Sequence, residues 1–142
     1  QLCALAFEDQ PRVQLCDIEL RREGKSFTVD TVGWLRQQYP QAQLYLLVGS
    51  DMFLSFECWK SWQQILQQVT LCTAARSTGE LLQLRRHARQ LMPYGSTLVF
   101  DFPVLEVSST QIRRRLKEGL DCSQLLPEKV YQQILQQNLY RG

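Results

Sequence analysis

The sequence predicts an α/β fold with a largely parallel sheet. Short apolar runs at residues 44–48 and 69–75 alternate with stretches in which apolar residues recur at helical spacing. The first run has no period-two alternation, which is typical of a strand buried on both faces of a parallel sheet. A chain of 142 residues is long enough to bury one sizeable core, so residues 1–142 are expected to form a single domain.

The composition is that of an ordinary globular protein, with 44% hydrophobic and 21% charged residues. No apolar run approaches the roughly 20 residues that span a bilayer, and the amino terminus lacks a secretory pattern, so we expect a cytoplasmic protein that does not bind membranes. A formal net charge of +2 is too small to indicate nucleic-acid binding. The five cysteines are widely spaced without a C-x-x-C pair, so they are interpreted as reduced small hydrophobic residues, with neither a disulfide framework nor a zinc site.

In the first half of the chain, each element is predicted from its apolar spacing and from the residues at its ends. In order, we expect the end of a helix at 2–7, a half-buried or edge strand at 13–19, a helix between 28 and 39, the strand at 44–48, a loop at 49–56, a helix at 59–68 and the strand at 69–75. Ser26 or Thr28 is the expected cap of the second helix, because a hydroxyl oxygen can accept from a first-turn amide.

The second half of the chain is predicted in the same way. In order, we expect a loop at 76–79, a surface helix at 80–92, strand segments at 97–102 and 104–107 split by Pro103, a helix from 109 that stops at Gly119, and a last helix from Pro127 that stops at Asn138. His87 is expected on the solvent side of the basic helix at 80–92.

A ligand site is predicted where the strand at 44–48 ends. Ligands of parallel sheets bind just beyond the carboxyl ends of the strands, where Gly49 allows a close approach to the backbone and Asp51 supplies a carboxylate. Trp59 and Trp62 follow at once. The residues alone leave alternatives open, since tryptophans at this spacing are typical of a core and Asp51 can simply cap the next helix.

A second candidate site is the start of the helix at 109, where Ser108, Ser109 and Thr110 follow directly on a strand. First-turn amides and the helix dipole favour an anion there, and Arg113 lies one turn further on. The alternative interpretation is structural: Ser109 is the N-cap, and the basic residues that follow form a solvated face.

Three stretches together resemble the bacterial nicotinate-nucleotide adenylyltransferases. They are SFTVDT at 26–31, GSDMFLSFECWKSW at 49–62 and VSSTQIRRRL at 107–116, the last of which is similar to the ISSTxIR motif of that family. The closing LLPEKVYQQILQQNLY also resembles the family's terminal helix. The resemblance covers essentially the whole chain and implies a Rossmann-like nucleotidyltransferase fold.

The resemblance implies transfer of the adenylyl group of ATP to nicotinate mononucleotide, which yields nicotinate adenine dinucleotide and pyrophosphate, with Mg²⁺ on the phosphates. ATP and nicotinate mononucleotide are then the expected partners, and an oligomer is left open. On the mononucleotide side, the matching positions are Thr28 and Thr31 for the nicotinate carboxylate, Asp51 for a ribose hydroxyl, Trp59 for stacking on the pyridine ring, and Lys60, and Gly49 is expected to let the ligand approach the backbone. On the ATP side, they are Arg76, Ser108, Ser109, Thr110 and Arg113.

The sequence departs from the family pattern at three places. Lys60 stands where many members have Tyr or His, so we expect it to neutralise a carboxylate or phosphate instead. Ser77 replaces the proline of an RRPG-like loop. The chain also lacks the family's opening strand and its GxFDPxHxGH loop, so no catalytic residue is assigned here.

About fifty to sixty residues are therefore expected to be missing at the front, by comparison with the usual first βα unit of a doubly wound sheet. We accordingly expect a domain that is partial at its amino terminus, impaired catalysis by this chain alone, and an uncovered face or edge of the strand at 44–48.

Two alternative functions remain. One is a related adenylyltransferase with another acceptor, such as pantetheine phosphate, against which SFTVDT and WKSW argue. The other is a non-catalytic α/β binding domain.

Overall fold

The computed structural model of the chain describes residues 1–75, 77–102 and 107–140. The chain divides into two compact units, one made of Gln1–Asp17 with Leu105–Gly142 and the other of Ile18–Val104. Each unit has its own hydrophobic cluster. The residues predicted as one domain therefore contain two hydrophobic cores.

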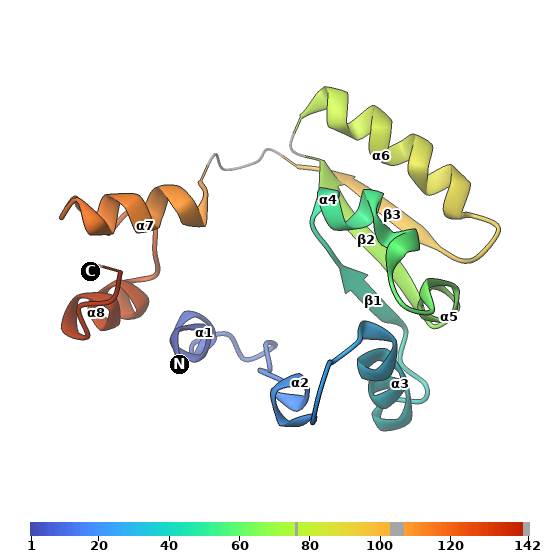
Figure 1. Cartoon of the computed structure of the whole chain (residues 1–142), viewed down its shortest axis with the longest axis horizontal. Helices are drawn as coiled ribbons and strands as arrows, with labels where there is room; N and C mark the ends of the chain where they lie inside the picture. Colours follow the sequence, from blue (N-terminus) through green and yellow to red (C-terminus); the bar gives the residue numbers. More distant parts are fainter. Residues whose placement is uncertain (76, 103–106, 141–142) are drawn as a thin grey trace. The chain divides into compact units, whose positions relative to one another are not determined.

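The larger unit, Ile18–Val104, is built on a parallel sheet of three described strands. They are β1 (Leu44–Leu47), β2 (Val69–Ala75) and β3 (Thr97–Asp101), in the order β1-β2-β3 (Figure 1). Leu44 pairs with Val69, and Leu71 pairs with Thr97. The predicted α/β class and parallel sheet are confirmed.

The helices of this unit supply most of the side chains that pack on the sheet. They are α2 (Ile18–Arg21), α3 (Thr28–Gln38), α4 (Ser50–Leu54), the 3-10 helix η1 (Phe56–Cys58), α5 (Trp62–Leu66) and α6 (Thr78–Leu91). Helices α4, α5 and α6 all contact the middle strand β2 (Figure 1). The buried cluster contains Val32, Phe53, Phe56, Ile65, Leu66, Val69, Leu71, Ala75, Leu81, Leu84 and Leu91.

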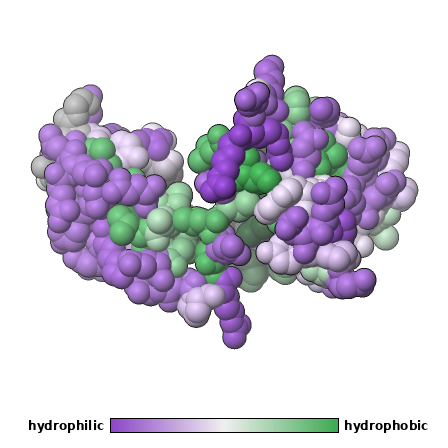
Figure 2. Space-filling view, turned by 90° about the horizontal axis from the view of Figure 1, so that it is seen from below, coloured by the Kyte–Doolittle hydropathy of each residue, from purple (hydrophilic) through white to green (hydrophobic). Residues whose placement is uncertain are grey.

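Strand β1 is half exposed, although its sequence predicts burial on both faces. Leu44 and Leu46 pack against the core, whereas Tyr45 and Leu47, which point the other way, are 56% and 71% exposed. Figure 2 shows that hydrophobic side chains are also exposed elsewhere among the hydrophilic ones, on one face of the molecule. Among the described strands β1 pairs with β2 alone, so the expectation of an uncovered edge is confirmed and that of two buried faces is wrong.

The strand predicted at 13–19 does not form. Residues 13–17 have no regular structure, and Ile18 begins the short helix α2. Val13 and Leu15 are exposed, and neither described strand pairing involves this segment. Alternation alone cannot make a strand, because the backbone groups of a strand need a neighbour with which to pair.

Other boundaries shift by a few residues. The predicted loop at 49–56 contains α4, for which Gly49 is the N-cap, and the helix predicted from Trp59 begins only at Trp62. The strand at 69–75 is confirmed by β2, and the helix predicted at 80–92 is α6, which begins at Thr78, within the predicted loop at 76–79, and ends at Leu91. Of the segment predicted at 104–107, only Val107 lies within the described residues, and it is not in a strand.

The smaller unit is helical. It contains α1 (Leu2–Phe7), α7 (Ser109–Lys117) and α8 (Glu128–Gln136), around a cluster of Leu116, Cys122, Val130 and Ile134. Gly119 and Asn138 adopt positive φ angles of 71° and 53° just after α7 and α8, which confirms both predicted stops. Lys129 Nζ lies 2.9 Å from Glu8 Oε2 and 3.0 Å from Asp9 Oδ2, and these hydrogen bonds raise the pKa of Lys129.

All five cysteines are free, but their environments differ. Cys72 and Cys122 are buried, and burial raises the pKa of the Cys72 thiol. Cys3, Cys16 and Cys58 are exposed, so the interpretation as small hydrophobic residues holds only for the first pair. Within the described parts of the chain, no helix is long and apolar enough to cross a membrane.

Helix α6 allows a matched test of this packing. Leu84 is fully buried in the core, whereas Leu82 in the same helix is 65% exposed. We expect Leu84→Ala to lower the free energy of unfolding by about 2–5 kcal/mol, and Leu82→Ala to change it by no more than about 0.5 kcal/mol. Both are measured by urea denaturation, and equal losses would contradict the placement of α6.

Candidate functional site

An open cavity in the larger unit brings together two of the segments singled out from the sequence. Its volume is about 310 Å³, and its lining residues are Ser26, Phe27, Thr28, Cys58, Trp59, Lys60 and Ile65. The first three come from the start of α3 and the next three from η1 and the turn that follows it. The stretches at 26–31 and 49–62, separate in the sequence, therefore meet at one site.

Trp59 forms one wall of this cavity and is anchored by the core behind it. Its ring lies 5.3 Å from that of Phe56, which is fully buried, while Trp59 itself is only half-buried. Trp62 packs instead against Phe56 and Tyr94 and does not line the cavity. The sequence left open whether the two tryptophans belong to the core or to a ligand site. Trp62 is a packing residue, whereas Trp59 packs on the core and also faces the cavity.

The start of α3 differs from the prediction. The N-cap is Phe27, whose side chain has no acceptor, and Thr28 is already the first helical residue. Ser26 Oγ instead donates to the backbone oxygen of Glu19, 3.0 Å away. The predicted caps are therefore wrong, and the first amides of α3 receive no cap from the Phe27 side chain.

Thr31 does not line the cavity. Its hydroxyl donates to Glu19 Oε1 at 2.6 Å and accepts from Arg22 Nη1 at 3.3 Å. It therefore ties the segment around α2 to α3. Thr28 is the member of the predicted pair that faces the cavity.

Gly49 and Asp51 lie where predicted, directly after β1. Gly49 is the N-cap of α4, with an ordinary extended conformation, and Asp51 is in the first turn of that helix. Neither belongs to the described lining of the cavity. The structure thus leaves Asp51 exposed in the first turn of α4, just beyond the carboxyl end of β1 and outside the cavity lining.

The prediction that His87 lies on the solvent side of its helix is wrong. Its side chain is only 11% exposed, its ring packs edge-on against Phe53, and its Nε2 lies 3.9 Å from Glu57 Oε2. Its Nδ1 lies 3.2 Å from Gln90 Oε1. The helical spacing indicates this burial, because residue 87 lies three positions after the buried Leu84 and therefore on the same face of the helix. His87 thereby packs α6 against the segment that leads into Trp59.

The second candidate site lies in the smaller unit. Ser108, and not Ser109, is the N-cap of α7: its Oγ accepts from the Gln111 amide at 3.1 Å, and Gln111 Oε1 accepts from the Ser108 amide at 3.1 Å. Ser109, Thr110 and Arg113 are exposed. Ser109 and Arg113 also line a small apolar cavity of about 160 Å³. Arg76, the remaining predicted residue, lies outside the described residues.

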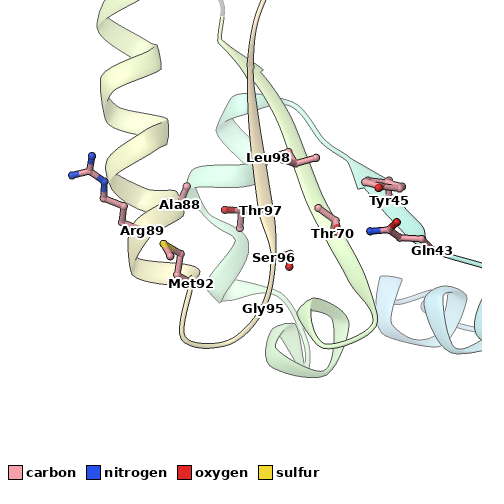
Figure 3. A pocket seen from close by; sticks show the side chains of 10 residues that line it. All are labelled: Gln43, Tyr45, Thr70, Ala88, Arg89, Met92, Gly95, Ser96, Thr97 and Leu98. Atoms are coloured by element: carbon pink, nitrogen blue, oxygen red, sulfur yellow. The ribbon is translucent and has the colours of Figure 1, made fainter.

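A larger open hollow, of about 720 Å³, was not predicted (Figure 3). Gln43, Tyr45, Thr70 and Thr97 line it, so it lies toward the amino ends of the strands, away from Asp51. No predicted site residue contributes to it. In the described parts of the chain, no group of three His, Cys, Asp or Glu side chains is placed to hold a metal ion.

Residues 1–115 match the family described as cytidylyltransferase-like, in agreement with the parallel sheet. A relative from Desulfitobacterium hafniense, named "Probable nicotinate-nucleotide adenylyltransferase", is 36% identical over 140 residues, which are 96% of this chain and 67% of the relative. One from Clostridium tetani is 30% identical, over 96% of this chain and 69% of the relative. This chain belongs to the nicotinate-nucleotide adenylyltransferase family.

Solved structures give the same fold. Plasmodium falciparum nicotinic acid mononucleotide adenylyltransferase, complexed with APC, superimposes with a TM-score of 0.62 at 16% identity, over 83% of this chain and 60% of that one. A nicotinate-nucleotide adenylyltransferase from Vibrio parahaemolyticus superimposes with a TM-score of 0.61 at 20% identity. The match covers 96% of this chain and 66% of that one. The Rossmann-like nucleotidyltransferase fold is confirmed, and the chain spans roughly two thirds of its curated relatives.

The cap of α7 can be tested with two neighbouring serines. We expect Ser108→Ala to lower the stability of the smaller unit by about 1 kcal/mol, because an N-cap hydroxyl is lost. Ser109→Ala should change it by no more than about 0.5 kcal/mol. Hydrogen exchange of the Gln111 amide, which Ser108 accepts from, measures the effect. A greater effect of Ser109→Ala would show that the cap is misplaced.

Proposed function

We propose that this chain provides the nicotinate mononucleotide site and part of the ATP site of an adenylyltransferase. The reaction transfers the adenylyl group of ATP to nicotinate mononucleotide and gives nicotinate adenine dinucleotide and pyrophosphate, a step of NAD biosynthesis. The single observation that carries the proposal is the cavity shared by Thr28, Trp59 and Lys60, in a chain of this family.

The chemistry of the cavity suits a nicotinate group. The half-buried indole of Trp59 offers a flat apolar wall on which a pyridine ring can stack. The start of α3 supplies first-turn amides and the positive end of a helix dipole, both of which favour a carboxylate. The Thr28 hydroxyl adds a donor. At about 310 Å³ the cavity has room for a small ligand group.

The remaining mononucleotide contacts belong to the proposal as well. Asp51, exposed at the carboxyl end of β1, is suited to accept from ribose hydroxyls, and Gly49 before it adds no side chain to obstruct them. Thr31 acts indirectly, through its hydrogen bond with Glu19, as a residue that positions the start of α3.

On the ATP side we assign phosphate binding to the exposed start of α7. Ser109 and Thr110 lie in its first turn, where amides and hydroxyls favour phosphate, and Arg113 adds a guanidinium one turn later. Ser108 already uses its hydroxyl in the cap, so its part is to hold these amides in place. Arg76 is proposed as a further cation.

Mg²⁺ enters the proposal through ATP. This ion keeps several waters and commonly binds through substrate phosphates with one or two carboxylates. Its expected ligands here are the phosphates themselves. The ion would neutralise phosphate charge.

The chemical step needs no covalent enzyme intermediate. An oxygen of the mononucleotide phosphate attacks the α-phosphorus of ATP in line, a new P–O bond forms, and the bond to the β-phosphate oxygen breaks as pyrophosphate leaves. Catalysis then rests on positioning and charge neutralisation. The proposal extends to a cytoplasmic location, where both nucleotide substrates are dissolved.

Binding of nicotinate mononucleotide to the 142-residue chain, measured by calorimetry, tests the proposed function. We expect Trp59→Ala to raise Kd roughly 5- to 150-fold, because stacking on an aromatic side chain contributes about 1–3 kcal/mol per ring. Trp59→Phe should keep most of the affinity, and Tyr39→Ala, outside the cavity, should keep all of it. Absence of binding to the unaltered chain at millimolar ligand would refute the proposal.

The ATP side is tested by two arginines of one helix. We expect Arg113→Ala to raise the Kd for Mg·ATP roughly 13- to 160-fold, since a charge-assisted hydrogen bond contributes about 1.5–3 kcal/mol. Arg114, whose Nε lies 3.9 Å from Glu118 Oε1, is the matched control, and Arg114→Ala should change Kd less than about twofold. Equal effects of the two substitutions would indicate only general charge attraction.

A further inference from the structure

We propose that Lys60 is a specificity-determining residue, whose ammonium pairs with the carboxylate on the pyridine ring and so selects the acid over the amide form of the mononucleotide. This inference rests on the proposed function and deepens it.

The position of the Lys60 side chain is the first observation. Its Nζ lies 4.1 Å from the centroid of the Phe27 ring, and both residues line the cavity. A cation over an aromatic face is attracted by the ring. Lysine otherwise carries a compact charge on a flexible four-carbon stem. The Phe27 ring therefore gives this ammonium a preferred place, at the start of α3 where a carboxylate is also favoured.

The backbone beside Lys60 is the second observation. Ser61 adopts a left-handed conformation with φ of 53°, which is uncommon for a residue other than glycine. Trp62 then begins α5, and its ring is held by Phe56 and Tyr94. Because Trp59 and Trp62 are both anchored on Phe56, the short turn between them has fixed ends. Lys60 is thus presented to the cavity from a defined turn.

The charge balance of the cavity is the third observation. Among its described lining residues, Lys60 alone carries a charge, and the others are Ser26, Phe27, Thr28, Cys58, Trp59 and Ile65. The lining therefore contains no carboxylate that could neutralise the ammonium. A ligand that brings its own carboxylate into this cavity balances the charge, whereas a neutral carboxamide does not and also places its NH₂ group near a cation.

The test compares nicotinate mononucleotide with nicotinamide mononucleotide on the full chain, by calorimetry. Lys60→Met removes the charge but keeps an unbranched apolar stem. We expect it to raise Kd for the nicotinate form up to about fivefold, because an ion pair of an exposed lysine contributes at most about 1 kcal/mol, and to leave Kd for the nicotinamide form unchanged. Lys60→Arg, which keeps the charge, should retain a preference for the acid. Lys117→Met, on exposed α7, is the matched control and should change neither value.

Salt provides a readout that a purely structural role of Lys60 would not change. We expect the acid preference of the unaltered chain to decrease as salt rises, and the residual preference of Lys60→Met to depend less on salt. Lys60→Gln gives a second neutral variant in case Lys60→Met folds poorly, as judged from circular dichroism.

The outcomes separate the two proposals. If the unaltered chain binds neither mononucleotide, the proposed function fails and the role of Lys60 fails with it. If it prefers the nicotinate form and both neutral variants keep that whole preference, the role of Lys60 is refuted while the proposed function stands.

Discussion

The burial of strand β2 is the constraint on which the larger unit depends. It pairs in parallel with β1 on one side and β3 on the other, and all but one of its seven residues are buried. Three helices contact it, and two of them, α4 and α5, flank the η1 segment that carries Trp59 toward the cavity. Since those helices are placed by packing on β2, the positions of Phe56 and Trp59 follow from the same apolar contacts.

Elements with strong local signals could be predicted from the sequence. The apolar run of β2, the leucine spacing of α6 and Gly119 after α7 each determine local structure without help from distant residues. The strand expected at 13–19 and the two buried faces of β1 could not be predicted in this way. Both depend on which other segment lies alongside, and alternation or apolar content does not encode the neighbour.

The candidate site shows the same division. The sequence motifs predicted ligand-binding residues in the stretches at 26–31 and 49–62. In the structure, Thr28, Trp59 and Lys60 of these stretches line one cavity. Thr31, one turn beyond Thr28, is instead bonded to Glu19, twelve residues earlier. The capping role of Ser108 rather than Ser109 likewise depends on a reciprocal pair with Gln111, which hydroxyl content alone does not reveal.

The mostly buried histidine on α6 gives the molecule a built-in spectroscopic reporter. His87 is the one histidine among the 142 residues, so its imidazole protons give resonances without overlap from any other. The ring sits against Phe53, near Glu57 of η1 and Gln90 of α6. Its chemical shifts therefore register small displacements of the turn that leads to Trp59, and a ligand that enters the cavity becomes visible at a nucleus it does not touch.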